Sequence, residues 1–418
     1  MARDGGDEKR IAVVGGGPAG MMLAYLLAKE GVRVTVLERH PDFRREFRGE
    51  TVQPDVVQLL QELGIHQKIA GATSPLDDVL IEVANTPVMR VRGARGPASA
   101  GAELIPQPLL LETLHAECSR HPGYQILFNT AVARLGRDGQ DGGRVTHLVV
   151  RREGREERID ADLVVVCSGR GSPLRQQGGA KVEHGELARR ALWMAFDQPP
   201  GFGRGMSMHV APGGDLFVIF PTQGQRVLVA WSKPDDGSAA ILKTHDITAL
   251  KEALLRGAPA RLRPLVAEQL SEATSRQFFN VAADLVETWH APGVLFLGDA
   301  AHTMQAIGGY GINVAIQDAV CAADHLLEAL GKGESLDLVG PRVQAERKPR
   351  IAEVQKRQAR MAWLFYRAPT WLQKLLFRTA SAFAALAASR FMTAAFKLRH
   401  IERRSAGAPQ SSGAGVNT

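Results

Sequence analysis

A glycine-rich stretch near the start of the chain combines residues whose types and spacing suit one kind of chemistry. Three glycines follow the pattern Gly15-x-Gly17-x-x-Gly20, and Glu38 comes 18 positions after the last of them. In such a pattern the first glycine permits a tight turn, the second lets the backbone approach a pyrophosphate, and the third lets a helix lie close to a strand. The acidic residue is placed to accept hydrogen bonds from a ribose diol. The predicted contacts are Gly15, Gly17, Pro18, Ala19, Gly20, Glu38 and Arg39.

The elements around these residues support a dinucleotide site. Residues 11–14 are apolar and β-branched, which is typical of a buried strand, and residues 21–29 favour a helix. A second strand is expected over residues 32–37, ending at Glu38. The unpaired N–H groups at the helix start would hold the phosphates. A glycine turn in an ordinary α/β sheet is the alternative, and this motif alone does not separate FAD from NAD.

A second stretch, about 280 residues later, carries two further signals. Residues 294–297 predict a buried strand that ends in Gly298-Asp299, and residues 308–313, Gly-Gly-Tyr-Gly-Ile-Asn, open a helix. Together with the first motif, this resembles the FAD-dependent aromatic monooxygenases of the para-hydroxybenzoate hydroxylase type. The resemblance covers roughly residues 8–345. It implies that Asp299 binds ribitol or phosphate oxygens of FAD.

The resemblance also places the glycine-rich loop of the second stretch against the flavin ring. The dipole of the following helix then points at the pyrimidine end, where a helix N-terminus stabilises the negative charge of reduced flavin. The implied contacts are Gly308, Gly309, Gly311, Ile312 and Asn313. Two further positions match the family. Arg48 falls in its arginine loop and Gln107 begins a helix whose first polar residue contacts FAD, although a surface arginine and an ordinary helix start are the plainer interpretations.

The chain departs from the family pattern in two places. Ser168 stands where the family has the aspartate of an Asp-Gly pair, and Ala306 stands where a proline is common. The first change replaces a carboxylate acceptor with a hydroxyl. It bears on how NADH or NADPH is engaged more than on FAD binding.

The predicted fold is α/β, with a Rossmann-like FAD-binding domain similar to para-hydroxybenzoate hydroxylase, an inserted antiparallel-sheet substrate domain and C-terminal helices. The alternating pattern within residues 179–279 predicts four strands of a separate sheet. A β-ribbon is expected over residues 144–159. The expected boundaries are 8–80, 98–178 and 280–340 for the FAD-binding domain, 81–97 and 179–279 for the sheet domain, 341–400 for the helical region and 406–418 for a disordered tail.

The resemblance implies that FAD, reduced by NADPH or NADH, reacts with O2 to a C4a-hydroperoxide that hydroxylates or epoxidises an apolar aromatic or quinone-like substrate, in secondary metabolism. Flavin carries this chemistry, so no triad or metal cluster is required. A base that ionises a phenol is optional. His302 and His209 are candidates, but neither is assigned a catalytic role, so the catalytic residues stay unknown.

The substrate is expected between the inserted sheet and the flavin. Large side chains on the predicted strands could line that cavity, although aromatics that alternate on strands more often form core. They are Trp193, Met208, Phe217, Phe220 and Trp231. An apolar aromatic or prenylated molecule is the expected partner.

Size and composition set the remaining limits. The 418 residues are 45% hydrophobic and 23% charged, with 51 Lys and Arg against 44 Asp and Glu, as in a basic but ordinary globular protein. The three cysteines, Cys118, Cys167 and Cys321, form no CxxC pair, which argues against a disulfide framework or a cysteine metal site. No signal peptide, spanning segment or nucleic-acid module is expected, and a cytoplasmic location is predicted.

The C-terminal region suggests a peripheral membrane contact. Residues 371–400 are apolar with interspersed Lys and Arg, a pattern that an interfacial helix tolerates. Packing against the FAD-binding domain or a partner subunit is the alternative, and the oligomeric state is unknown.

The sequence alone also allows other functions. A reductase that saturates double bonds of a lipophilic substrate is the main alternative, since the changed Asp-Gly pair favours it slightly. A flavin halogenase is disfavoured because no Trp-x-Trp-x-Ile-Pro stretch occurs. A non-enzymatic flavin-binding protein and a plain NAD dehydrogenase are weaker possibilities.

Overall fold

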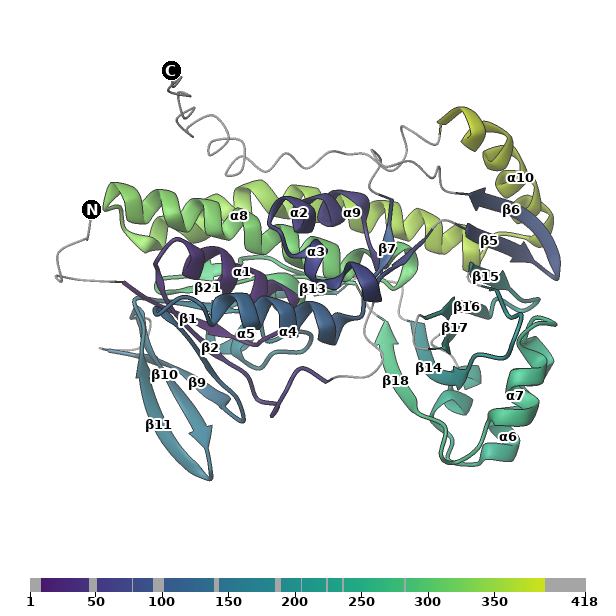
Figure 1. Cartoon of the computed structure of the whole chain (residues 1–418), viewed down its shortest axis with the longest axis horizontal. Helices are drawn as coiled ribbons and strands as arrows, with labels where there is room; N and C mark the ends of the chain where they lie inside the picture. Colours follow the sequence, from purple (N-terminus) through teal and green to yellow (C-terminus); the bar gives the residue numbers. More distant parts are fainter. Residues whose placement is uncertain are drawn as a thin grey trace, which may run out of the picture.

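The computed structural model describes residues 9–44, 51–76, 78–92, 101–138, 143–184, 189–203, 205–222, 225–234, 237–281 and 283–387. Figure 1 shows a parallel sheet and a large second sheet at opposite ends of the molecule, with the long helix α8 over the parallel sheet and α9 extending from there toward the second sheet. Arg48 and the tail from residue 388 onward lie outside the described residues.

A six-stranded sheet forms the centre of the cofactor-binding part. Its parallel strands read as continuous apolar runs because both faces are covered, as the burial of all four residues of β12 shows. In spatial order the strands are β20 (His290–Ala291), β21 (Val294–Phe296), β12 (Leu163–Val166), β1 (Arg10–Val14), β2 (Arg33–Leu37) and β8 (Tyr124–Leu127). Only β20 pairs antiparallel within this sheet.

Helices cover one face of this sheet. The helix after the first glycine motif, α1 (Pro18–Lys29), packs against α4 (Gln107–Cys118) and against α8 (Tyr310–Lys332). On the outer side of α8 lies α9 (Val339–Tyr366). Shorter helices nearby are α2 (Pro54–Glu62) and α3 (His66–Ile69). Among the described residues, the apolar cluster between these elements is the largest, and it joins the first and last thirds of the sequence.

A three-stranded sheet covers the other face. It consists of β9 (Ala131–Arg137), β10 (Val145–Arg152) and β11 (Arg155–Asp160), and α5 (Leu174–Gln177) lies beside it. We expected a two-stranded ribbon, so β9 was missed. Its sequence, Ala-Val-Ala-Arg-Leu-Gly-Arg, mixes small and charged residues and gives only a weak strand signal.

The second large sheet has seven strands: the four expected within residues 179–279, one further strand at residues 276–281, and a hairpin at residues 78–92, most of which lies in the segment 81–97 assigned to the same domain. In spatial order they are β18 (Arg276–Val281), β14 (Arg189–Asp197), β17 (Arg226–Pro234), β16 (Leu216–Pro221), β15 (Met206–Val210), β5 (Asp78–Val83) and β6 (Thr86–Arg92). All neighbours pair antiparallel except β15 and β5, which run parallel. The sheet is therefore mixed, because a hairpin from the first quarter of the chain extends its edge.

Each face of this sheet has its own cover. On one face, α6 (Ile247–Gly257) and α7 (Arg263–Gln269) close an apolar cluster that includes Phe217 and Trp231. On the other, the cluster joins Met208 to Ile307 and to the helices α9 and α10 (Thr370–Ala387). We call these the helix-covered face and the flavin-side face, because Ile307 directly precedes the glycine loop of the second motif.

Short strands connect these parts. They are β3 (Thr51–Val52), β4 (Ser74–Pro75) and β7 (Glu103–Leu104) in one small sheet and β13 (Val182–His184) and β19 (Asp284–Val286) in another. Short 3-10 turns span Ala70–Ala72, Gly237–Lys243, Gly298–Ala300, Ile307–Gly309 and Leu336–Leu338. Within the described part of the chain, no helix is both long enough and apolar enough to cross a bilayer.

Candidate functional site

The glycine turn between β1 and α1 is closed toward the sheet and open on its outer side. Gly15 has a φ of 105°, and a Cβ there would lie 2.6 Å from the carbonyl oxygen of Cys167. A Cβ on Gly20 would lie 2.0 Å from the carbonyl oxygen of Gly15. A Cβ on Gly17 would meet no atom within 4 Å. The first N–H groups of α1, which have no partner inside the helix, therefore border a space that a ligand can enter.

Glu38 reaches this turn from the end of β2. Its side chain is buried, and its two carboxylate oxygens accept the N–H groups of Gly16 at 2.8 Å and His40 at 3.0 Å. Arg39 is exposed and donates from Nε to His40 at 3.1 Å. The carboxylate is thus held at the rim of the turn, where a ribose diol would meet it.

The two distant motifs meet at Gly298. This residue has a φ of 58°, and a Cβ on it would lie 3.4 Å from Cβ of Ala19 in α1 and 3.3 Å from Cβ of Ala315 in α8. Asp299 follows directly, with its side chain one-third exposed. The glycine turn, the Gly298-Asp299 turn and the start of α8 therefore surround one space.

The loop before α8 is held by backbone geometry and by one amide side chain. Gly308 and Gly309 have φ values of 82° and 62°, a conformation that suits glycine. Asn313 is buried, accepts the N–H of Gln53 at 2.7 Å, and donates to the carbonyl oxygens of Thr51 at 2.9 Å and Gly309 at 2.7 Å. Its side chain therefore fastens the loop to β3, while Gly311 and Ile312 form the first helical turn beside it.

Behind these turns lies a buried ion network that sequence reasoning missed. Asp318 of α8 accepts from Nε of Arg347 at 2.7 Å, contacts Nε2 of His302 at 2.6 Å, and accepts the N–H of Gly298 at 3.2 Å. Burial alone would raise the pKa of Asp318, but His302 and Arg347 hold it below its ordinary value. His302 is fully buried in this network, so it supports the Gly298-Asp299 turn from behind.

The segment in which Ser168 replaces the aspartate of the family lies beside Asp299. Ser168 donates from Oγ to Oγ of Ser172 at 2.7 Å. Arg170 Nε lies 3.8 Å from a carboxylate oxygen of Asp299, and Arg175 donates from Nε to the carbonyl oxygen of Ala300 at 2.7 Å. The hydroxyl of Ser168 thus bonds within its own loop, and two arginines carry the link to the Gly298-Asp299 turn.

The remaining expected cofactor contacts are placed as follows. Gln107 is buried at the first turn of α4, which packs on α1. The expected contact at Arg48 lies outside the described residues. The donor set fits a flavin dinucleotide: helix-start N–H groups for the diphosphate, Glu38 for a ribose, and Asp299 with the α8 N-terminus for the ribitol and ring.

The predicted substrate residues divide between the two faces of the seven-stranded sheet. Cross-strand neighbours share a face, and Trp193, Ala230, Val218 and Met208 form one such row on the flavin-side face. Trp193 stacks there on Phe220, with ring centroids 5.8 Å apart and planes 9° apart.

Phe217 and Trp231 belong to the opposite row. They stack at 5.8 Å with an interplanar angle of 6°, are at most 1% exposed, and pack among residues of α6 and α7. His209, pairing with Phe217, lies in the same row. We therefore correct the expected substrate set: Trp193, Met208 and Phe220 stay in it, while Phe217 and Trp231 leave it because they face away from the flavin side.

Comparison with known proteins gives a family match over most of the chain. The family model described as an FAD binding domain matches residues 8–358. A 6-methylpretetramide 4-monooxygenase of Streptomyces rimosus is 32% identical over 371 residues, covering 85% of each chain. The ubiquinone hydroxylase UbiL of Rhodospirillum rubrum is 26% identical over 348 residues, covering 80% of this chain and 76% of the relative.

A solved structure has the same fold. PqsL of P. aeruginosa, in complex with 2-aminobenzoylacetate, superposes with a TM-score of 0.75 at 20% identity. The match covers 89% of this chain and all of that one.

Proposed function

The chain belongs to the FAD binding domain family and is an FAD-dependent monooxygenase, and from that premise we propose that it inserts one oxygen atom into an apolar polycyclic aromatic or quinone-like substrate. When bound, FAD accepts a hydride from NADH or NADPH and activates O2. The observation that supports the site is the convergence of Ala19, Gly298 and Ala315, which joins the diphosphate turn to the flavin-side loop.

Each group of this site has a task in the proposal. The N-terminus of α1 binds the diphosphate and Glu38 binds a ribose. The N-terminus of α8 stabilises negative charge on the reduced ring. Asp318, with His302 and Arg347, holds the Gly298-Asp299 turn in position, because Asp318 accepts the N–H of Gly298.

The substrate class follows from the surface beside the flavin loop. The row through Trp193, Val218 and Met208 is apolar, and the Trp193–Phe220 stack offers flat rings to a flat ligand. Relatives named for 6-methylpretetramide and ubiquinone support such a substrate. A dry, apolar surface also keeps water away from the reactive flavin.

The test is a panel of polycyclic aromatic and quinone compounds added to the flavin-loaded protein with NADH or NADPH. We expect one class to accelerate flavin reduction and to couple it to O2 uptake, with one oxygen atom recovered in the product. Substrate reduction without O2 uptake would instead identify a reductase of lipophilic double bonds. Acceleration by no member of the panel would contradict the proposed substrate class.

We also propose that the protein contacts a membrane surface peripherally through α10. On α10, Trp371, Leu375 and Leu376 are 67%, 51% and 40% exposed, and the same helix carries Lys374 and Arg378. Exposed aromatic and leucine side chains with basic neighbours suit an anionic bilayer surface. Flotation with anionic liposomes tests this: Trp371→Ser with Leu375→Ser should abolish association, and an unchanged distribution of the double variant would refute the contact.

A further inference from the structure

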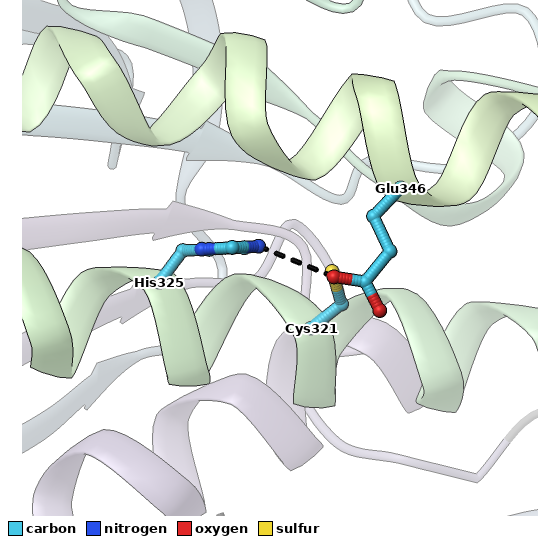
Figure 2. Close-up of side chains that lie close together, drawn as sticks. All are labelled: Cys321, His325 and Glu346. Atoms are coloured by element: carbon cyan, nitrogen blue, oxygen red, sulfur yellow. Dashed lines mark hydrogen bonds and ion pairs between the residues drawn. The ribbon is translucent and has the colours of Figure 1, made fainter. Parts of the chain in front are cut away.

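A cluster of three side chains whose types can ligate metals lies where α8 packs on α9, away from the flavin site. Cys321 and His325 are four residues apart on α8, so they share one helix face. Glu346 reaches them from α9 (Figure 2). Cys321 lies eight residues beyond Asn313, about 12 Å further along the helix. The cluster is therefore separate from the loop that faces the flavin.

The three potential ligand atoms lie close together. The sulfur of Cys321, an imidazole nitrogen of His325 and a carboxylate oxygen of Glu346 all lie within 4.8 Å of one another. Nε2 of His325 is 3.4 Å from Oε2 of Glu346. Neighbouring ligands of a tetrahedral zinc ion lie about 3.3 to 3.8 Å apart. A cation would thus require the widest pair to close by only about 1 to 1.5 Å.

The surroundings orient the cluster and leave it an entrance. Oε1 of Glu346 lies 3.8 Å from Nη2 of Arg350, which directs Oε2 toward His325. Cys321 is buried, whereas the side chains of His325 and Glu346 are 19% and 26% exposed. The sulfur therefore lies deeper in the protein than the imidazole and the carboxylate, both of which reach solvent.

We propose that Cys321, His325 and Glu346 form a binding site for a divalent transition-metal ion, with Zn²⁺ as the preferred occupant. A sulfur, nitrogen and oxygen donor set selects zinc or cobalt over magnesium or calcium, which favour oxygen ligands alone. On binding, a metal–sulfur bond forms and the thiol proton passes to water. Three ligands are the protein contribution of an open zinc site, with water in the fourth position.

The environment of the free thiol lowers the affinity expected for a metal. Burial and then the charge of Glu346 raise the pKa of Cys321, so a metal ion must displace a proton that the thiol holds firmly. Nδ1 of His325 is buried with no hydrogen-bond partner in the described part of the chain. Metal-binding histidines ordinarily donate this second N–H, and losing that partner weakens affinity about 10- to 100-fold. We therefore expect micromolar rather than nanomolar binding.

The site would fasten the helix that supports the flavin loop. Further along α9, Gln358 donates from Nε2 to the carbonyl oxygens of Gln305 at 2.8 Å and Ile307 at 2.7 Å. A metal that bridges α8 and α9 binds only the folded protein and so raises its thermal stability. Thermal unfolding thus provides a readout that needs no catalysis.

The test uses the flavin-loaded full chain, stripped with a chelator and then equilibrated with Zn²⁺. At zinc concentrations well above micromolar we expect about one bound zinc per chain by equilibrium dialysis and elemental analysis, a higher Tm, and cobalt d–d bands beyond the flavin absorption when Co²⁺ replaces Zn²⁺. Cys321→Ser and His325→Gln should each weaken binding at least tenfold. Glu346→Gln changes a partly exposed side chain and should weaken binding without affecting the flavin spectrum.

Two matched controls define the outcome. Cys118→Ser removes another buried cysteine, and His66→Gln removes a histidine that contacts Glu103 at 3.0 Å with similar burial. Both controls should bind zinc like the wild type. The proposal is overturned if the wild type retains no zinc at micromolar concentration, or if the three cluster variants bind as well as the controls.

Discussion

The two faces of the seven-stranded sheet carry nearly identical aromatic pairs in opposite surroundings. Phe217 and Trp231 stack at 5.8 Å on the helix-covered face, and Trp193 and Phe220 stack at 5.8 Å on the flavin-side face. The first pair is buried under α6 and α7, while the second stays half-buried. Two aromatic pairs with the same stacking geometry therefore differ in what they can do. The covered pair stabilises the sheet, whereas the half-buried pair is accessible to a ligand.

Truncating Trp231, one ring of the covered pair, should have the largest effect on stability. Trp231→Ala leaves a cavity and also removes the bond from Nε1 to Asp215 at 2.9 Å. We expect the free energy of unfolding to fall by about 3–5 kcal/mol, measured by denaturant titration. A loss below about 1 kcal/mol would mean that this face is not tightly packed, and the two faces would then not differ in stability.

The helix-covered face also holds a histidine that should make stability depend on pH. Burial, and then the charge of Arg263, lowers the pKa of His209 to about 4, and Glu82 lies 4.0 Å away. The folded state thus requires neutral His209: its contribution is complete above about pH 6.5 and is lost as the pH falls toward 4, by up to about 3 kcal/mol. His209→Gln should flatten this part of the stability profile. An unchanged slope in thermal scans across that range would contradict the assignment.

The flavin-side pair should show the reverse pattern. Trp193→Ala removes one ring of the proposed substrate surface, so we expect KM to rise about tenfold, which corresponds to about 1.4 kcal/mol. The loss of stability should be smaller than for Trp231→Ala because Trp193 is only half-buried. Steady-state kinetics alongside denaturation separate the two effects. Equal stability losses at both tryptophans with KM unchanged would remove the functional difference between the faces.

The smallest effect on stability is expected at α10, which packs along the β6 edge of the same sheet. Trp371 is 67% exposed, so Trp371→Ser should change the free energy of unfolding by no more than about 0.5 kcal/mol. A larger loss in the same denaturant titration would show that this side chain supports the sheet edge rather than an external surface.

Much of the cofactor-binding part could be predicted because its signals are local. The positions of β1, α1, β2, β21 and α8 follow from short apolar runs and from glycines at fixed offsets. Asp318 and Arg347 could not be identified in this way, since their roles arise only when α8 and α9 pack together. The parallel pairing of β5 with β15 was also missed, because it joins strands more than a hundred residues apart.

The sequence by itself determined that this protein binds a dinucleotide, since the glycine motif acts through the backbone conformation of a few consecutive residues. That the dinucleotide is FAD came from the resemblance of both motifs to a known family. Only the tertiary structure decided which side of the inserted sheet meets the flavin loop, and thus which aromatic residues are available to a substrate. It also decided that Cys321 and His325 meet Glu346 from another helix. A period-2 strand pattern shows that two faces differ but not what covers each one, because the cover comes from distant segments.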